Sequence, residues 1–258
     1  MEEKDMNHIQ KLFSLEGKRA VVTGANTGLG QGICVALAAA GAHVYGVARR
    51  SCAETMEKIN EVGGNFTEVI ADLSDLSAID KILDAVSGER IDILVNNAGI
   101  IRRDDDIDVT LEDWDAVIDL NQKMVFFLSQ AFAKQWIADG KGGKIINIAS
   151  MLSYQGGIRV PAYTTSKSGI AGLTRALANE WAKYNINVNG IAPGYMATNN
   201  TAQLRGDSER NSDILARIPA GRWGTPEDMY GAAIFLASDA SAYMNGFTIA
   251  VDGGWLAR

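Results

Sequence analysis

Histidine is nearly absent from this chain, which has two among 258 residues. His8 lies in a charged N-terminal stretch and His43 stands before a β-rich run, and neither has a cysteine or a second histidine at ligand spacing. Zinc sites are built mostly from histidine and cysteine, and a Ser-His-Asp hydrolase triad needs a histidine base. We therefore expect no metal site and no hydrolase triad, so acid/base chemistry must use tyrosine, lysine, serine, asparagine or carboxylates.

Cysteine and proline are scarce as well, with two and four residues respectively. Cys34 and Cys52 cannot build a disulfide framework, and Cys34 falls inside an apolar helical pattern that is typical of a core thiol. No proline-rich linker, repeat or low-complexity tract divides the chain. With 47% hydrophobic residues, the sequence predicts one domain over residues 1–258, in a reducing compartment.

Long hydrophobic runs and an excess of basic charge are also missing. The apolar runs end after about ten residues, as in residues 33–42, whereas a membrane span needs about 20. The first residues are charged and contain no apolar secretory segment. Lysine and arginine number 24 against 31 acidic residues, for a net charge of −7, which argues against nucleic-acid binding. We expect a cytoplasmic protein that binds neither membranes nor nucleic acid.

What the chain has is a regular alternation of short β-rich apolar runs with longer helical patterns. The expected strands are residues 19–23, 43–48, 66–71, 91–95, 144–149, 187–191 and 248–251. The expected helices are residues 29–40, 54–62, 76–86, 112–136, 162–184 and 227–237. Strands that alternate with helices and are apolar throughout predict a parallel sheet with both faces covered. The expected fold class is therefore α/β, a single-domain, Rossmann-type, doubly wound parallel sheet of seven strands with helices on both faces.

A glycine-rich stretch, residues 23–30, joins the first expected strand to an alanine-rich helix. Glycine permits a tight turn and a close backbone approach, and the following helix offers free N–H groups and a positive dipole to phosphate. A glycine cluster alone is also typical of an ordinary turn. Its position between the first strand and the first helix favours a nucleotide-binding site.

Tyr163 and Lys167 lie four residues apart in an expected helix, thirteen residues after Ser150. Positions i and i+4 share one helix face, so the ammonium of Lys167 can lie beside the phenol of Tyr163. A fixed positive charge favours the phenolate, and we expect Lys167 to lower the pKa of Tyr163. Ser150, at the end of an expected strand, can donate to the same substrate oxygen. A lone Tyr-x-x-x-Lys pair is usually only a helix surface, whereas this trio predicts a device for moving a proton on or off a carbinol oxygen.

These segments occur in an order that resembles the short-chain dehydrogenase/reductase family. The order is T-G-x-x-x-G-x-G after the first strand, N-N-A-G at residues 96–99, Asn121, Ser150, Tyr163, Lys167 and Pro193-Gly194. The resemblance covers residues 17–254. It implies an NAD- or NADP-dependent oxidoreductase whose catalytic residues are Asn121, Ser150, Tyr163 and Lys167, with Asn121 holding a water that links Lys167 to solvent.

The same resemblance implies a cofactor site along the carboxyl ends of the strands. Asp72 would contact the adenine ring and Asn97 would close the site. Outside this context, Asp72 and Asn121 would be interpreted as a loop carboxylate and a helix-surface amide. The implied cofactor residues are Gly24, Asn26, Thr27, Gly28, Leu29, Gly30, Arg49, Asp72, Leu73, Asn97, Ala98, Gly99, Tyr163, Lys167, Pro193, Gly194, Met196 and Thr198.

The end of the second strand indicates which cofactor is expected. An acidic residue there binds the ribose hydroxyls of NAD, whereas arginine suits the 2′-phosphate of NADP. Ala48 occupies the usual acidic position, and Arg49 and Arg50 follow it. Thr27 stands where many NADP-dependent relatives carry a basic residue, and the arginines alone are also typical of a solvated loop. NADP and NAD both stay open, and the sequence favours NADP.

The segments that follow the strands are expected to line the substrate pocket. Arg102, Arg103 and Arg159 occur there, and arginine binds a carboxylate through two parallel hydrogen bonds. Arg102 and Arg103 are also compatible with an ordinary surface. Residues 198–218 interrupt the alternation of elements, and a mobile lid over the site is expected there. The expected substrate-binding residues are Arg102, Met151, Gln155, Arg159 and Tyr195.

Four stretches around this pocket resemble the sugar-acid dehydrogenases of the family. They are residues 142–163, 191–201, 217–224 and 248–258. Those enzymes interconvert a keto group and an alcohol on a sugar acid during the breakdown of uronic-acid polysaccharides. They are usually described with NAD, so Ala48, Arg49 and Arg50 are a departure from their pattern. The resemblance implies a keto-deoxy sugar acid as substrate, with gluconate 5-dehydrogenases as near neighbours.

Two other functions and the oligomeric state stay open. A 3-oxoacyl thioester reductase shares the fold and the catalytic residues, but it needs an apolar groove, which the polar residues 198–200 fit poorly. A non-catalytic protein on this fold would be signalled by loss of the tyrosine or lysine, and both are present. The family commonly forms tetramers through its long helices, so we expect a homo-oligomer built on residues 112–136 and 162–184, a tetramer with a dimer as the alternative.

Overall fold

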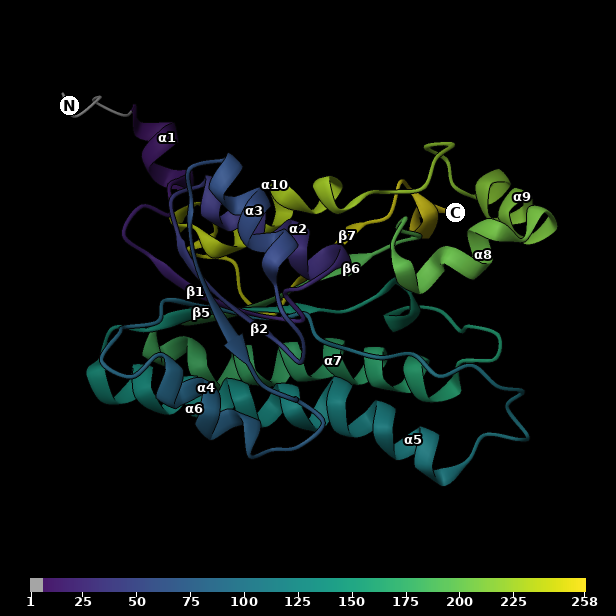
Figure 1. The fold of residues 1–258 in the computed structure, drawn as a ribbon, viewed down its shortest axis with the longest axis horizontal. Coiled ribbons are helices and arrows are strands. Elements are labelled where there is room, and N and C mark those ends of the chain that lie inside the picture. Colours follow the sequence, from purple (N-terminus) through teal and green to yellow (C-terminus); the bar gives the residue numbers. More distant parts are fainter. Residues whose placement is uncertain (1–6) are drawn as a thin grey trace.

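Seven parallel strands form one sheet in the order β3-β2-β1-β4-β5-β6-β7 in the computed structural model, which describes residues 7–258 (Figure 1). The strands are β1 (Arg19–Thr23), β2 (His43–Ala48), β3 (Asn65–Ile70), β4 (Ile93–Asn96), β5 (Gly143–Ile148), β6 (Ile186–Pro193) and β7 (Thr248–Val251). Every neighbouring pair is parallel. The expected α/β fold is confirmed, including the doubly wound parallel sheet of seven strands.

Helices cover both faces of this sheet (Figure 1). They are α1 (His8–Phe13), α2 (Gly28–Ala39), α3 (Ala53–Glu61), α4 (Ala78–Ala85), α5 (Leu111–Ile118), α6 (Met124–Asp139), α7 (Pro161–Trp181), α8 (Ala202–Gly206), α9 (Ser208–Arg217) and α10 (Tyr230–Ala237). α2, α3 and α10 lie on one face, and α4, α6 and α7 lie on the other. α8 and α9 lie together at one end, beside the C-terminus. Within residues 7–258, no helix is long and apolar enough to cross a membrane.

The prediction of one continuous α-helix over residues 112–136 is wrong. A π-helical turn (Asp119–Lys123) separates α5 from α6, so that one strand-to-strand connection contains two α-helices. A 3-10 turn (Ala182–Tyr184) likewise ends α7 earlier than expected. No sequence pattern pointed to α1, which is capped by reciprocal hydrogen bonds between the side chains and backbone N–H groups of Asn7 and Gln10.

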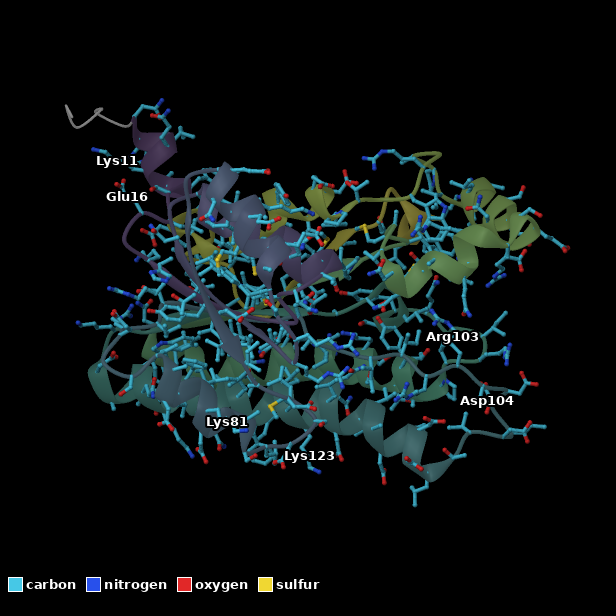
Figure 2. All side chains as sticks on the ribbon, viewed as in Figure 1. Lys11, Glu16, Lys81, Arg103, Asp104 and Lys123 are labelled. Atoms are coloured by element: carbon cyan, nitrogen blue, oxygen red, sulfur yellow. The ribbon has the colours of Figure 1, made fainter. Side chains whose placement is uncertain are left out.

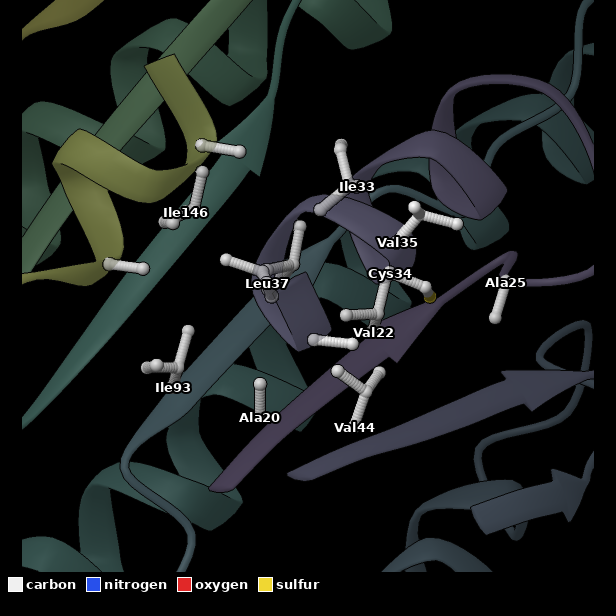
Figure 3. Close-up of a cluster of buried hydrophobic side chains, with 14 of the residues drawn as sticks. Ala20, Val22, Ala25, Ile33, Cys34, Val35, Leu37, Val44, Ile93 and Ile146 are labelled. Atoms are coloured by element: carbon white, nitrogen blue, oxygen red, sulfur yellow. The ribbon is translucent and has the colours of Figure 1, made fainter. Parts of the chain in front are cut away.

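The core fills both sides of the sheet, because successive strand residues point to opposite faces. In β1, Val22 packs against α2 whereas Val21 packs on the other side, and both are fully buried. Figure 3 shows the cluster of buried side chains that contains Val22, in which Ile33 and Leu37 of α2 pack against the strands. Each such aliphatic side chain contributes about 1.5–3 kcal/mol when it leaves water. Cys34 is fully buried in the same cluster, as its helical pattern predicts.

The strand order reverses at β1, whose neighbours are β2 on one side and β4 on the other. Such a switch point leaves a crevice outside the carboxyl ends of two strands, where open α/β sheets bind their ligands. The glycine-rich stretch follows β1, and the segment that contains Asn97 follows β4. The topology therefore brings two of the expected cofactor-binding segments together.

Candidate active site

A cleft of about 1240 Å³ opens along the carboxyl ends of the strands and reaches α8 and α9. It is lined by every expected cofactor and substrate residue, and by Ser150, Tyr163 and Lys167. Asn121 is the exception, because it is buried behind the wall of the cleft. Figure 2 labels Arg103 at this end of the molecule, where the segment after β4 approaches α8. The structure thus brings the expected nucleotide and substrate ends into one cavity.

The turn after β1 forms one wall of the cleft, and a Cβ at Gly24 or Gly30 would meet atoms closer than 3 Å. Gly24 has a left-handed backbone with φ 69°, and a Cβ on Gly30 would lie 2.1 Å from the carbonyl oxygen of Gly24. The side-chain amide of Asn97 donates to the carbonyl oxygens of Thr23 (2.8 Å) and Gly24 (3.3 Å). α2 begins at Gly28, so its first N–H groups have no partner within the helix. These features fit the pyrophosphate of a dinucleotide.

The end of β2 borders the same cleft. Ala48, the last residue of β2, is buried, and the exposed Arg49 and Arg50 that follow it line the cleft. Asp72 accepts the backbone N–H of Ser74 at 3.0 Å, and this bond, helped by the charge of Arg49, lowers the pKa of Asp72. Two arginines without an acidic residue at the end of the strand suit an anionic group such as a phosphate.

Ser150, Tyr163 and Lys167 converge on the cleft from β5 and α7. β5 ends at Ile148, so Ser150 follows the strand and caps a short 3-10 turn, where its hydroxyl accepts the N–H of Leu152 at 3.1 Å. Tyr163 and Lys167 lie one turn apart on α7, with the ammonium nitrogen 5.7 Å from the centre of the phenol ring. The ammonium donates to the carbonyl oxygen of Ile148 at 2.6 Å.

Burial sets the protonation of this pair. It raises the pKa of the Tyr163 phenol, while a hydrogen bond with Ser150 and the charge of Arg103 act in the opposite direction. Burial also lowers the pKa of Lys167 to about 8. The expectation that Lys167 lowers the pKa of Tyr163 is therefore wrong for this structure, because the ammonium bonds a backbone carbonyl and the phenol is desolvated. Lys167 can exchange a proton near pH 8.

Asn121 lies on the π-helical turn between α5 and α6, a type of turn that is frequent at functional sites. Its side-chain oxygen accepts the N–H of Ile100 at 2.9 Å, and its side-chain nitrogen donates to the carbonyl oxygen of Ile100 at 3.0 Å. The same nitrogen donates at 3.1 Å to the hydroxyl of Ser166, the residue before Lys167. Asn121 therefore holds the segment after β4 against α7 from behind the cleft.

Two arginines expected to bind substrate already contact carboxylates. The Nε of Arg159 lies 2.8 Å from Oδ1 of Asp105, and the Nε of Arg102 lies 3.2 Å from Oδ1 of Asp113. Both pairs are well exposed, and such pairs contribute about 0–1 kcal/mol. Arg159 also has a left-handed backbone with φ 63°, which is uncommon for a residue with a Cβ. The terminal nitrogens of both guanidinium groups are the ones left for a ligand.

Arg103 makes a different contact. Its terminal nitrogen donates to the carbonyl oxygen of Asn200 at 3.3 Å, which links the segment after β4 to the segment before α8. Its charge also acts to lower the pKa of Tyr163. Arg103 is therefore a cleft arginine whose charge acts on the phenol.

A buried polar network holds β4 and β5 in register below the site. The side-chain nitrogen of Asn96 donates to the hydroxyl of Ser129 at 3.0 Å and to the side-chain oxygen of Asn147 at 2.9 Å. Asn147 in turn donates to the hydroxyl of Thr174 on α7 at 3.0 Å. A buried polar group without a partner costs about 1–3 kcal/mol, so this network fixes the strand ends that carry the site.

The expected residue set left out Arg217 and Trp255, although a lid over residues 198–218 and the C-terminal stretch were both expected at the pocket. Trp255 is 4% exposed, lines the cleft and packs edge-on against Tyr195, with ring centres 4.8 Å apart. Arg217, the last residue of α9, lies 4.0 Å over the Trp255 ring. A tryptophan inside a glycine-rich terminal segment is the signal that could have indicated this wall. Other cleft residues outside the expected set include Arg50, Leu204, Arg210, Asp213 and Ile214.

Curated relatives match almost the whole chain. The 2-dehydro-3-deoxy-D-gluconate 5-dehydrogenase of Escherichia coli (strain K12) is 61% identical over 252 residues, which cover 97% of this chain and 100% of the relative. The enzyme of the same name from Bacillus subtilis (strain 168) is 51% identical over 255 residues, which cover 98% and 100%. A family model described as enoyl-(acyl carrier protein) reductase matches residues 24–256.

A solved structure gives the same picture of the fold. A crystal structure described as a 2-deoxy-D-gluconate 3-dehydrogenase from Agrobacterium tumefaciens with bound NADP has a TM-score of 0.92 at 59% identity. The match covers 96% of this chain and 99% of that chain. Together with the curated relatives, it confirms the resemblance to sugar-acid dehydrogenases that the pocket segments indicate.

Proposed function

Because the chain belongs to the short-chain dehydrogenase/reductase family, we propose that it is an NAD(P)-dependent oxidoreductase of a sugar acid. The reaction interconverts a secondary alcohol and a ketone, with a hydride passing between the carbinol carbon and the nicotinamide and a proton leaving or joining the oxygen. The substrate is a keto-deoxy sugar acid of the kind named for the E. coli and B. subtilis relatives, reacting at carbon 5.

One observation carries this proposal. Ser150, Tyr163 and Lys167 line the same cleft as the glycine-rich turn and a group of arginines. The turn suits a dinucleotide, the trio suits proton transfer at a carbinol oxygen, and the arginines suit an acidic substrate. A nucleotide-binding protein without redox chemistry would not need the trio.

Within this proposal, each catalytic residue has a separate task. Tyr163 exchanges the proton with the substrate oxygen, and Ser150 donates to that oxygen and polarises the carbonyl. Lys167, whose pKa burial lowers to about 8, passes the proton onward. Asn121 holds a water that connects Lys167 to solvent. Its bonds to Ile100 and Ser166 support this role, because they fix the turn beside α7.

The substrate end is proposed to bind the sugar acid through polar groups from several loops. Arg102, Met151, Gln155, Arg159 and Tyr195 line it. α8 and α9 occupy most of residues 198–218, and we assign to them the role of a lid. The cleft reaches both helices, so their movement would open and close the substrate end.

Both NADP and NAD suit the proposed reaction, and NADP is favoured. Ala48 leaves no carboxylate at the end of β2 to repel a 2′-phosphate, and Arg49 and Arg50 line the adjacent wall of the cleft. The A. tumefaciens structure with bound NADP supports the same choice.

The proposed setting is a cytoplasmic homo-oligomer that acts in the breakdown of uronic-acid polysaccharides. The relatives named for a keto-deoxy sugar acid support the metabolic role. α6 and α7 form an outer helical layer on one face of the sheet, and this layer is the surface on which a tetramer would assemble (Figure 1). Sedimentation or light scattering would measure the assembly.

A substrate panel tests the proposed function. NADPH and NADH are each assayed with 5-keto sugar acids and an acetoacetyl thioester, and NADP⁺ and NAD⁺ with 2-dehydro-3-deoxy-D-gluconate and gluconate. We expect the highest kcat/KM with the keto-deoxy sugar acid. A preference for gluconate would make the protein a gluconate 5-dehydrogenase. Turnover of the thioester alone would contradict the proposal and favour the 3-oxoacyl thioester reductase.

A further inference from the structure

Gln155 is held in one orientation by donors from two distant parts of the chain. Its side-chain oxygen accepts the indole N–H of Trp255 at 3.1 Å and an N–H of Arg217 at 3.3 Å. In a primary amide only the carbonyl oxygen accepts hydrogen bonds, so the amide nitrogen points away from both donors. Gln155 lines the cleft and is half-buried, which leaves this nitrogen to offer its two N–H groups to a ligand.

Arg217 is fixed from the opposite side. Its guanidinium carbon lies 4.0 Å over the ring of Trp255, which is 4% exposed. The side chain of Arg258 donates to the carbonyl oxygens of Arg217 (3.2 Å) and Ala216 (2.8 Å), and these bonds secure the last turn of α9. Among residues 7–258, no carboxylate forms an ion pair with Arg217, so the guanidinium N–H groups that Gln155 does not use stay free.

The other arginines near the reacting group are less suited to anchor a substrate carboxylate. Arg102 and Arg159 each hold an aspartate through Nε. Arg103 donates to the carbonyl oxygen of Asn200, and its charge acts to lower the pKa of Tyr163. A sugar acid that reacts at carbon 5 carries its carboxylate at the other end of the molecule. The partner of that carboxylate therefore lies away from the phenol, and Arg217 on α9 is a cleft arginine that is available to bind it.

We propose that Gln155 and Arg217 form the subsite for the substrate carboxylate, an inference that rests on the proposed function. The N–H groups of Gln155 donate to one carboxylate oxygen, and Arg217 supplies the charge and a second donor. Trp255 positions both side chains. The loop after β5, α9 and the C-terminal segment each contribute one member, so the subsite exists only when these three segments are together.

Gln155→Glu is the sharpest test, because the two side chains have the same shape. Glutamate keeps an acceptor for Trp255 and Arg217, but it presents a charged oxygen to the cleft in place of N–H groups. The kcat/KM for 2-dehydro-3-deoxy-D-gluconate should fall about 100-fold, mainly through KM. The dissociation constant of NADPH and the thermal midpoint should not change.

Asn211→Asp is the matched control. The side-chain oxygen of Asn211 accepts the indole N–H of Trp223 at 2.8 Å, and this residue also lies on α9. The substitution adds the same charge to α9, the helix that carries Arg217, but Asn211 does not line the cleft. Its kcat/KM should stay within about twofold of the unaltered protein. A loss as large as that of Gln155→Glu would show a general effect of added negative charge near the substrate end and would overturn the subsite.

Arg217→Met and Arg159→Met compare the two arginines directly. Methionine retains an apolar stem, and loss of a charged hydrogen bond corresponds to roughly a 10- to 100-fold change in affinity. We expect KM for the sugar acid to rise by this factor in Arg217→Met and by a much smaller factor in Arg159→Met. A larger rise in KM for Arg159→Met than for Arg217→Met would overturn the subsite. So would values of KM and kcat for Gln155→Glu and Arg217→Met that equal those of the unaltered protein. If the unaltered protein turned over no sugar acid, the proposed function itself would fail, and the subsite with it.

Discussion

The ammonium of Lys167 donates to the carbonyl oxygen of Ile148 at 2.6 Å, and this bond joins α7 to the last residue of β5. It places a buried amine where the chain leaves the sheet towards Ser150. Because burial lowers the pKa of Lys167 to about 8, the folded protein and the unfolded chain hold this proton over different pH ranges. The stability of the fold is therefore linked to the protonation of Lys167.

Lys167 should make the fold more stable as the pH rises from 8 to 9. The unfolded lysine keeps its ordinary pKa of 10.5 and stays protonated, whereas the folded protein releases the proton near pH 8. The unfolded state then binds more protons, so Lys167 should add about 1 kcal/mol to the free energy of unfolding over this interval, measured as the difference from a variant without the amine. Urea unfolding at both pH values measures the change, and Lys167→Met should lose it. An equal rise in the variant would assign the effect to other groups.

The comparison with Lys167→Met matters because two buried thiols act in the opposite direction over the same interval and at higher pH. Burial raises the pKa of Cys52 from 9.0 to about 11 and also raises the pKa of Cys34. The unfolded thiols, with a pKa of 9.0, already lose protons between pH 8 and 9 and lose more above it, so they lower the free energy of unfolding as the pH rises. Lys167→Met keeps both thiols, so the difference between this variant and the unaltered protein isolates the contribution of Lys167.

Tyr163→Phe should remove turnover while leaving cofactor binding nearly intact. The substitution deletes only the phenol oxygen, and positioned acid/base catalysis contributes typically 10²–10⁴-fold. We expect kcat to fall by at least about 100-fold, with the NADPH dissociation constant from fluorescence titration within about threefold. Full activity in this variant would contradict the proposed role of Tyr163.

Arg49→Gln should shift the cofactor preference towards NAD. Loss of a charge-assisted hydrogen bond to a 2′-phosphate should lower kcat/KM for NADPH by roughly 10- to 100-fold, and kcat/KM for NADH should change little. Arg50→Gln, assayed in parallel, identifies which of the two arginines makes the contact. An equal loss with both cofactors would mean that Arg49 supports the fold of the loop and does not read the phosphate.

Gly30→Ala should abolish cofactor binding. Its Cβ would lie 2.1 Å from the carbonyl oxygen of Gly24 and 2.4 Å from the side-chain nitrogen of Asn97, so the turn must move. Gly231→Ala in α10 is the control, because no atom lies within 4 Å of its Cβ. The control should bind NADPH normally and gain up to about 1 kcal/mol of stability, since alanine favours helices. Tight NADPH binding by Gly30→Ala would show that the turn is not the phosphate site.

The sheet could be predicted from the sequence because its signals are local. The expected bounds of β1, β2 and β7 match the structure to the residue, since each is an apolar run between turn-forming residues. The division of the helix over residues 111–139 could not be predicted in this way. Its π-helical turn is accompanied by the bonds of Asn121 to Ile100 and Ser166, which belong to other segments.

That the proposed cofactor residues share one cleft could be predicted for a similar reason, because these residues fall in short motifs of fixed order. The substrate half depends on contacts between distant residues. Gln155 forms hydrogen bonds with Arg217 and Trp255, which lie 62 and 100 residues away in the sequence, and no local pattern predicts either contact. The raised pKa of Tyr163 was missed because the sequence shows the neighbouring lysine but not the burial of the phenol.

The π-helical turn that carries Asn121 constrains how this protein can be stabilised by evolution or design. Deleting one residue between Asp119 and Lys123 would allow one regular α-helix, with better hydrogen-bond geometry. Because a π-helical turn holds one residue more than an α-helical turn, the deletion would close the widened turn that carries Asn121 and leave α5 and α6 as one regular helix. Asn121 would then swing away from Ile100 and Ser166. Selection for heat resistance alone would favour this deletion, although it removes Asn121 from its contacts at the site. A thermostable descendant that keeps its activity must therefore gain stability at other positions in the chain.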